Sequence, residues 1–235
     1  IKTGKIRSGL FSSLNFIKRI VLDNQSLINL EFFSSLKPET LNALAGRGFQ
    51  RDINAGYNLV IEGLAAEACY FVLSGQLRVS RMNRDGRIQI LARLGAGEPV
   101  NVISLLKEDR INHASVESLT DSSVLVLLAN DFDEFLSHYP DFSTALLKNL
   151  ANRMAKTTSL AANLSLYTVR SRLAQFLIDL AAHPQSAGGW TQDEIAAHIG
   201  TVRDVVGRLL REFESQGLIE RDRQKIILLD KEALM

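Results

Sequence analysis

One stretch near the C-terminus most strongly constrains the fold of this chain, because its pattern is that of two short helices joined by a tight turn. Thr191 and Glu194 have the spacing of a capping box at a helix start. Ile195 and Ile199 lie four residues apart, on one face of that helix. Gly200 then gives the backbone the freedom that a sharp turn between packed helices requires. The stretch therefore predicts a helix-turn-helix.

The second helix of this pair has an apolar face and a polar face. Arg203, Asp204 and Arg208 are expected on the polar face, near the start of the helix. A recognition helix inserts such residues into the major groove of DNA, where an arginine can donate two hydrogen bonds to guanine. The apolar stripe is expected to contain Val202, Val205, Val206, Leu209, Leu210 and Phe213. We expect double-stranded DNA as a partner, bound through Thr191, Gln192, Thr201, Val202, Arg203, Asp204, Arg208 and Arg211.

The residues that follow predict a small β-hairpin. Gly217 is suited to end the second helix, and residues 218–221 and 226–229 flank a polar turn. A hairpin at this place would complete a winged helix-turn-helix. The alternative is an ordinary helix pair with solvated arginines, but the cap, the turn, the polar face and the wing together favour DNA binding.

Composition is that of a globular chain large enough for two domains. Hydrophobic residues make up 46% and charged residues 23% of the 235 residues, and the net charge is +1. Residues 168–235 contain nine Lys and Arg against ten Asp and Glu, so attraction to phosphates depends on where the charges lie. No apolar run reaches membrane-spanning length. The single cysteine, Cys69, excludes an intramolecular disulfide and an all-cysteine iron-sulfur cluster, and we expect a cytoplasmic protein without membrane attachment.

A long helix is expected before the helix-turn-helix. Asp141 can cap it after Pro140, and the residues that follow repeat with the spacing of a coiled-coil seam. This pattern predicts a homodimer. The alternative is a helix that packs on its own domain, because Phe142, Leu146 and Leu160 offer a second apolar face. The predicted dimer seam consists of Leu147, Leu150, Met154, Thr157, Ala161 and Leu164.

Residues from about 49 to 130 alternate short β-rich runs with turn glycines, which indicates an antiparallel barrel or jelly roll. The turn at residues 84–87, which contains Asp85 and Gly86, is a strong hairpin signal. Glycine turns also suit a phosphate pocket, although each is more often only a turn. The expected strands are residues 59–61, 69–73, 76–81, 87–94 and 124–128.

This order of parts resembles the superfamily of the cyclic-AMP receptor protein and the fumarate and nitrate reductase regulator (CRP/FNR). The resemblance covers roughly residues 26–235 and is carried by residues 70–79, the glycine turns, Pro140-Asp141 and residues 202–208. It implies an α+β fold with an N-terminal antiparallel β-roll, a long dimerisation helix and a C-terminal winged helix-turn-helix. It also implies that Arg203 and Arg208 read bases. Asp204 replaces a glutamate of the receptor protein and is one methylene shorter, so the expected contact to cytosine is altered.

The resemblance argues against cyclic AMP as the ligand. Relatives that bind it hold the ribose with a glutamate and the cyclic phosphate with an arginine, and Val102 and Asn112 occupy those two places. Without the cation and the acceptor, the buried phosphate charge is poorly compensated. Arg110 lies two positions from the expected arginine, and Thr157 and Thr158 match a hydroxyl pair that contacts adenine in relatives. The expected effector pocket contains Val102, Ile103, Asn112, His113, Thr157 and Thr158.

The sequence therefore does not identify the effector. Haem needs one or two axial ligands, which Cys69, His113 or His138 could supply, but a packed thiol at Cys69 and a structural role for His113 are the commoner outcomes. His183 and His198 are expected on helix surfaces. No catalytic motif and no metal-ligand spacing occurs, so the chain is not expected to be an enzyme.

The sequence thus predicts a homodimeric, sequence-specific transcription regulator, with RNA polymerase as a further partner implied by the resemblance. The alternative is an effector-independent regulator whose β-roll is a dimer scaffold or a partner-binding surface. A cyclic-nucleotide-gated enzyme or transporter subunit is disfavoured, since the chain ends just after the wing. The expected parts are a basic arm at 1–25, an effector-sensing β-roll at 26–140, a dimerisation helix at 141–166 and the DNA-binding domain at 167–235.

Overall fold

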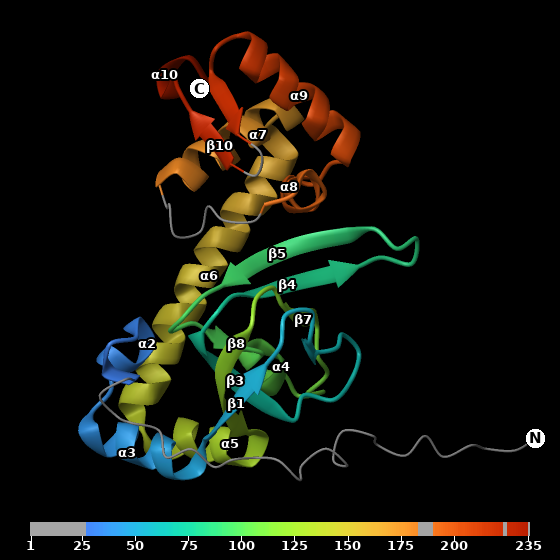
Figure 1. Cartoon of the computed structure of the whole chain (residues 1–235). Coiled ribbons are helices and arrows are strands. Elements are labelled where there is room, and N and C mark those ends of the chain that lie inside the picture. Colours follow the sequence, from blue (N-terminus) through green and yellow to red (C-terminus); the bar gives the residue numbers. More distant parts are fainter. Residues whose placement is uncertain (1–26, 183–189, 223–224, 235) are drawn as a thin grey trace, which may run out of the picture. The chain divides into compact units, whose positions relative to one another are not determined.

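The computed structural model describes residues 27–182, 190–222 and 225–234 (Figure 1). The chain divides into two compact units. The first contains the described residues up to Arg78 together with Leu94–Leu147, and the second contains Val79–Arg93 together with the described residues from Lys148 onward. The elements of each are given below in chain order.

The β-rich part contains two antiparallel sheets, as the alternation of short apolar runs and turn glycines predicted. One sheet has the strand order β1-β8-β3-β6 and the other β2-β7-β4-β5. All five predicted strands are present, whereas β1, β6 and β7 were not predicted. The strands are β1 (Phe49–Ile53), β2 (Asn58–Val60), β3 (Ala68–Ser74), β4 (Leu77–Met82), β5 (Ile88–Leu94), β6 (Pro99–Val100), β7 (Ser115–Ser118) and β8 (Ser122–Leu128).

Aromatic packing holds the first sheet against its helices. The ring of Phe71, on β3, lies 4.9 Å from Phe32 and 6.2 Å from Phe142, measured between centroids. All three side chains are buried, and burial of large apolar groups is the main favourable contribution to folding. The helices are α2 (Glu31–Ser34), α3 (Pro38–Arg47), α4 (Val102–Leu106), α5 (Ala129–His138) and the first turns of α6 (Pro140–Leu166).

The start of α6 corrects one prediction. The helix begins at Pro140, so Asp141 lies within its first turn rather than before it. The Asp141 carboxylate accepts hydrogen bonds from the Lys37 backbone N–H at 2.7 Å and from the Thr40 hydroxyl at 2.9 Å. Burial raises its pKa, but these hydrogen bonds dominate and hold the pKa below its usual range. Asp141 therefore ties α3 to the start of the long helix.

The C-terminal elements form the predicted winged helix-turn-helix. Its core is made by one face of each of three helices and by Leu218, Ile219 and Leu234. The end of the recognition helix has the predicted glycine: Gly217 has φ +71°, and the Leu218 N–H donates to the Phe213 carbonyl at 2.9 Å. The elements are α7 (Val169–Ala182), α8 (Gln192–Ile199), α9 (Arg203–Ser215), β9 (Ile219–Asp222), β10 (Lys225–Leu228) and α10 (Lys231–Leu234).

Candidate nucleic-acid interface

The first helix of the helix-turn-helix, α8, begins with the predicted capping box. The Glu194 N–H donates to the Thr191 hydroxyl oxygen at 3.2 Å, and the Thr191 N–H donates to Oε2 of Glu194 at 3.0 Å. The Thr191 hydroxyl also donates to that oxygen at 3.0 Å. These contacts satisfy backbone donors that have no partner within the helix, and they fix the end of α8 from which Thr191 and Gln192 project.

The turn after α8 favours a glycine mainly through its backbone conformation. Gly200 has φ +73° and ψ +48°, a left-handed conformation that side chains disfavour. A Cβ at this position would also lie 2.6 Å from Cδ2 of Leu164. The turn leads directly to Thr201 and Val202 and thereby sets the direction of α9.

The second helix, α9, has one buried face and one exposed face. Val206, Leu209 and Leu210 are buried, whereas Arg203, Asp204 and Arg208 are exposed near the start of the helix, as predicted. Val202 was wrongly predicted to be buried. Its side chain is 48% exposed, because Val202 is the N-cap residue, with extended backbone outside the helical stripe.

The exposed face of α9 contains an arginine that pairs with a carboxylate of α8. Nη1 of Arg203 lies 3.4 Å from a carboxylate oxygen of Asp193, on α8, and both side chains are 66% exposed. An ion pair this exposed contributes little to stability, so the guanidinium can exchange its partner at small cost. Arg211 is exposed one turn beyond Arg208. The arrangement therefore presents three arginines along one helix.

Gln192 and Thr201 border the recognition helix and are half-buried. Gln192 lies close to α9, since a Cβ at Gly207 would be 3.0 Å from its Oε1. Both residues therefore lie where α8 and α9 meet, which is the position from which such side chains contact phosphates in helix-turn-helix proteins.

The far end of α9 is fixed by two arginines from other elements. Arg170, on α7, pairs with Glu212, and its guanidinium lies 4.7 Å from the centre of the Phe213 ring. Arg221, on β9, donates from Nε to Glu214 at 2.9 Å, and this hydrogen bond holds the pKa of Glu214 below its usual range. The recognition helix is thus braced by α7 and by the wing.

His198 was wrongly predicted to lie on a helix surface. Its ring is half-buried and lies 5.4 Å from the Phe176 ring and 5.2 Å from the Trp190 ring, measured between centroids. Burial lowers the pKa of His198, and the positive charge of Arg93 lowers it further. His183 lies outside the described residues.

The polar side chains of the expected effector segment form hydrogen bonds with other groups of the protein. Nδ2 of Asn112 donates to the carbonyl oxygens of Ile61 and Ala65 at 3.1 and 3.3 Å, and its Oδ1 accepts from Asn101 at 2.9 Å. Val102 is buried, while the neighbouring Ile103 is exposed. The amide of Asn112 is therefore occupied in holding the loop between β2 and β3.

Two other polar groups of this segment are also engaged. Nη2 of Arg110 donates to both carboxylate oxygens of Asp133, on α5, at 2.7 Å. Nδ1 of His113 lies 3.1 Å from the Ser104 hydroxyl. In the sequence, Arg110 was notable only because it lies near the position of the expected phosphate-binding arginine. Its partner Asp133 lies on a different element and was not predicted.

The remaining pocket and seam residues lie on α6. Thr157 and Thr158 are exposed, and their hydroxyls donate to carbonyl oxygens of the preceding helical turn, each at 2.9 Å. Leu147 and Met154 are 67% and 73% exposed, and Leu164 is also exposed. Ala161 is exposed and Leu150 is half-buried. The predicted seam is thus a row of largely uncovered apolar side chains.

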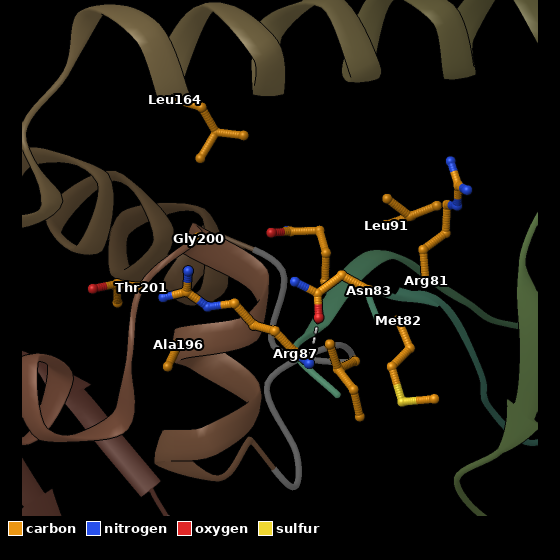
Figure 2. Close-up of a pocket in the computed structure, with 11 residues that line it drawn as sticks. Arg81, Met82, Asn83, Arg87, Leu91, Leu164, Ala196, Gly200 and Thr201 are labelled. Carbon is orange, nitrogen blue, oxygen red and sulfur yellow. Dashed lines mark hydrogen bonds between the residues drawn. The ribbon is translucent and has the colours of Figure 1, made fainter. Parts of the chain in front are cut away.

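A cavity that the sequence did not predict lies in the second unit. Figure 2 shows that Arg87 and Asn83, from the turn between β4 and β5, face Ala196, Gly200 and Thr201 of the helix-turn-helix. The Arg87 N–H donates to Oδ1 of Asn83 at 2.8 Å, which shapes the turn. The cavity has a volume of about 490 Å³ and is lined by Arg81, Met82, Asn83, Arg87, Ile88, Gln89, Leu91, Leu164, Ala196, Gly200 and Thr201.

Other chemistries have little support in the described residues. Cys69 is fully buried, and this burial raises the pKa of its thiol, which makes it a poor nucleophile or ligand. Within the part of the chain that the structure describes, no group of three or more His, Cys, Asp or Glu side chains is arranged to hold a metal ion. The described helices also include none long and apolar enough to cross a membrane.

Comparison with known proteins matches both halves of this arrangement. The cyclic nucleotide-binding domain family matches residues 50–139, and the Crp-like helix-turn-helix domain family matches residues 171–235. The CRP-like cAMP-activated global transcriptional regulator of Mycobacterium tuberculosis is 25% identical over 219 residues, which cover 90% of this chain and 97% of that relative.

Two further comparisons agree. The cAMP-activated global transcriptional regulator CRP of Salmonella typhimurium is 28% identical over 177 residues, covering 72% of this chain and 84% of the relative. The structure of the c-di-GMP-responsive global regulator CLP of Xanthomonas campestris matches with a TM-score of 0.75 and 21% identity, covering 83% of this chain and 100% of that chain. At this identity the last match concerns the fold alone.

Proposed function

The chain belongs to the CRP/FNR superfamily of transcriptional regulators. We propose that it acts as a homodimer, that it binds a two-fold symmetric DNA site and that it responds to an effector. Proteins of this superfamily are regulators rather than enzymes. The chain has the DNA-binding helix-turn-helix domain and the cyclic-nucleotide-binding-type domain of the family. The dimer, the operator and the effector are the parts that we propose.

The observation that carries the proposal is the exposed start of α9. Arg203, Asp204 and Arg208 are exposed there, while the opposite face of the helix is buried. An arginine in the major groove donates two hydrogen bonds to O6 and N7 of guanine, and a carboxylate can accept one from N4 of cytosine. We assign base reading to these three residues and phosphate contacts to Thr191, Gln192, Thr201, Val202 and Arg211.

The proposed dimer rests on the uncovered apolar row of α6. Leu147 and Met154 are largely exposed although they are among the most apolar side chains of the helix. Pairing two copies along this row would bury both sets of side chains, and burial stabilises by about 25 cal/mol per Å² of apolar surface. Two-fold symmetric pairing would then match the symmetry of the operator.

The effector that we propose differs from a cyclic nucleotide. Asn112 carries no charge and is held by three hydrogen bonds. Arg110 is paired with Asp133 in a partly exposed position, so its guanidinium would have to exchange this partner before it could bind a cyclic phosphate. For the segment that carries Val102, Ile103 and His113 we propose instead a largely apolar molecule with a few hydrogen-bonding groups, or haem ligated by His113. RNA polymerase is the further partner that we expect from the family.

The same contacts favour the second candidate, an effector-independent regulator whose β-roll serves as a dimer scaffold or partner-binding surface. Asn101, Asn112 and Arg110 all use their side chains within the protein. Ligand content of the native purified protein distinguishes the two candidates. A colourless protein with no bound small molecule and full operator affinity would favour the second one.

Binding-site selection from a library of random duplexes tests the proposal. We expect the recovered sequences to be two-fold symmetric, with half-site centres one helical turn, about 34 Å, apart. Recovery of sequences without symmetry, or no enrichment above the starting library, would contradict the proposed mode of reading.

Isothermal titration calorimetry tests the ligand. Cyclic AMP and cyclic GMP should bind weakly or not at all and should leave operator affinity unchanged, because a ligand that scarcely binds cannot shift a conformational equilibrium. Micromolar affinity together with tighter operator binding would mean that Arg110 leaves Asp133 and rebuilds a phosphate site. A Soret band that disappears in His113→Ala would identify haem instead.

A further inference from the structure

A buried ion pair joins strand β5 to helix α8. Nη2 of Arg93 lies 3.0 Å from Oε1 of Glu194, and the two side chains are only 11% and 14% exposed. Both residues belong to the same compact unit. An ion pair with this little solvent around it is screened far less than a surface pair, so the removal of either charge should have a larger effect than at the surface.

The carboxylate of Glu194 takes part in two separate contacts. Its Oε2 accepts hydrogen bonds from the Thr191 N–H and hydroxyl, which form the capping box of α8, while its Oε1 pairs with Arg93. The same carboxylate therefore caps the start of α8, the first helix of the DNA-binding motif, and attaches this helix to β5. Any movement of Arg93 acts directly on the capped end of α8.

Two further contacts reinforce this attachment. The guanidinium of Arg93 lies 3.6 Å from the centre of the Trp190 ring, close enough for a cation–π interaction. Nε2 of Gln89, four residues earlier on the same strand, donates to the carbonyl oxygen of His198 at 3.0 Å. The strand thus contacts both ends of α8, at Glu194 and at His198.

We propose that Arg93, Glu194 and Trp190 form a latch that holds the helix-turn-helix on the β4–β5 hairpin and so prepares the recognition helix for DNA. Arg203 stays 66% exposed while the latch is closed, so the closed latch is compatible with DNA contact. A motif held in one position loses less conformational entropy when it binds than a free one does. Opening the latch should therefore weaken operator binding.

The place of Arg93 in the chain gives the latch a regulatory role. Arg93 is four residues before Gly97, which opens the segment that carries Val102 and Asn112. A ligand or partner that shifts β5 would move Arg93 away from Glu194 and release α8. The DNA part of this inference rests on the proposed function, whereas the latch itself does not.

Trp190 is the only tryptophan of the chain and reports on the latch directly. In Arg93→Gln, we expect a changed emission maximum and stronger acrylamide quenching of Trp190. Glu194→Gln should give the same fluorescence change while α8 stays folded, because glutamine also completes a capping box. Arg84→Gln is the matched control, since Arg84 is an exposed arginine of the same hairpin. Unchanged Trp190 fluorescence in Arg93→Gln and Glu194→Gln would overturn the latch.

Binding to the duplex selected by the wild-type protein tests whether the latch affects DNA binding. Arg93→Gln should bind it about fivefold more weakly or worse, the lower end of typical coupling between sites, with unchanged binding to random duplex. The double variant with Glu194→Gln should be little weaker than either single variant, because each substitution removes the Arg93–Glu194 ion pair. Altered fluorescence with unchanged operator affinity would refute the role in DNA binding. A wild-type protein that selects no duplex would refute the proposed function, and fluorescence would still decide whether the latch exists.

Discussion

At the scale of single residues, the recognition surface depends on exchangeable contacts. Arg203 faces Asp193 across 3.4 Å in an exposed position. Such a pair is weak in water, so a guanine edge with two acceptors can replace the carboxylate without a large penalty. In the proposed complex, Asp193 would repel DNA phosphates near its own position, which would disfavour sequence-independent binding. The pair therefore favours base reading over general attraction to DNA.

His198 gives the DNA-binding domain a predicted dependence on pH. Its pKa is lowered in the folded protein by burial and by Arg93, with Asp179 opposing, so the unfolded chain takes up the proton first as pH falls. The associated stability is fully present above the unfolded pKa of about 6.5 and is lost as pH falls toward the lower folded value. Urea unfolding followed by Trp190 fluorescence should show a falling free energy of unfolding between neutral and mildly acidic pH.

His198→Gln should flatten this pH dependence. The matched control is His138→Gln, because His138 is exposed on α5, and it should keep the dependence of the wild-type protein. A His198→Gln protein with the full wild-type dependence would assign the effect to other groups.

Gly75 shows what one turn residue contributes. It has φ +87°, and a Cβ there would lie 2.1 Å from the Ser122 hydroxyl and 2.8 Å from the Asp121 carbonyl. Gly75→Ala should destabilise the protein by at least about 1 kcal/mol in thermal or urea unfolding. Gly46→Ala is the control, because Gly46 lies in helix α3 with nothing within 4 Å of its added Cβ. This change should stabilise by roughly 0.5–1 kcal/mol, and equal effects of the two substitutions would contradict the role of the turn.

Local signals made some residues predictable. Thr191, Glu194 and Gly200 were placed correctly because caps and turns depend on neighbours within four positions. Val202 and His198 were misplaced because their burial depends on where the helix starts and on the Phe176 and Trp190 rings. Tertiary partners of this kind leave no periodic signal in a single sequence.

At the scale of elements, the long helix α6 has an apolar row that the described chain does not cover. Leu147 and Met154 are exposed, and Leu150 is half-buried between them in sequence. Three heptads at this spacing give a seam long enough for a paired helix. The proposed dimer interface therefore lies mainly on α6.

Charged substitutions in the seam test the dimer. Leu150→Glu with Met154→Glu should place like charges against their symmetry mates, so the protein should sediment as a monomer and lose specific DNA binding. Ser159→Glu is the matched control, since Ser159 is exposed on α6 outside the predicted seam, and it should leave the dimer intact. A dimer that survives the double substitution would show that the seam is wrongly assigned.

Elements with a strong repeat were predictable, and short ones were not. The helices of the DNA-binding domain and the strand from Ala68 to Ser74 have clear periodicity or long apolar runs. Strand β1, with the sequence FQRDI, is mostly polar and pairs with β8, about 70 residues later. Strand β6 has only two residues. Such strands are stabilised by their partners, which sequence alone does not identify.

At the scale of the whole molecule, the order of a β-roll, a long helix and a winged helix-turn-helix could be predicted from sequence, whereas the contacts between distant residues could not. Arg93 and Glu194 are about 100 residues apart, and the capping box that identifies Glu194 gives no indication of Arg93 as its partner. Arg110 was singled out by its position, but its partner Asp133, on another element 23 residues later, was not predicted. We propose that contacts of this kind hold the expected effector segment and α8, so the proposed regulation depends on residues that the sequence alone does not bring together.

Base reading by the start of α9 can be tested by measuring the affinity of wild-type and Arg203→Ala protein for every single-base variant of the selected operator. We expect Arg203→Ala to lose about 1–3 kcal/mol of binding free energy and to lose discrimination at one guanine of each half-site, while preferences elsewhere persist. An unchanged preference at every position would contradict the claim, because it would mean that Arg203 contacts only phosphates or no DNA at all.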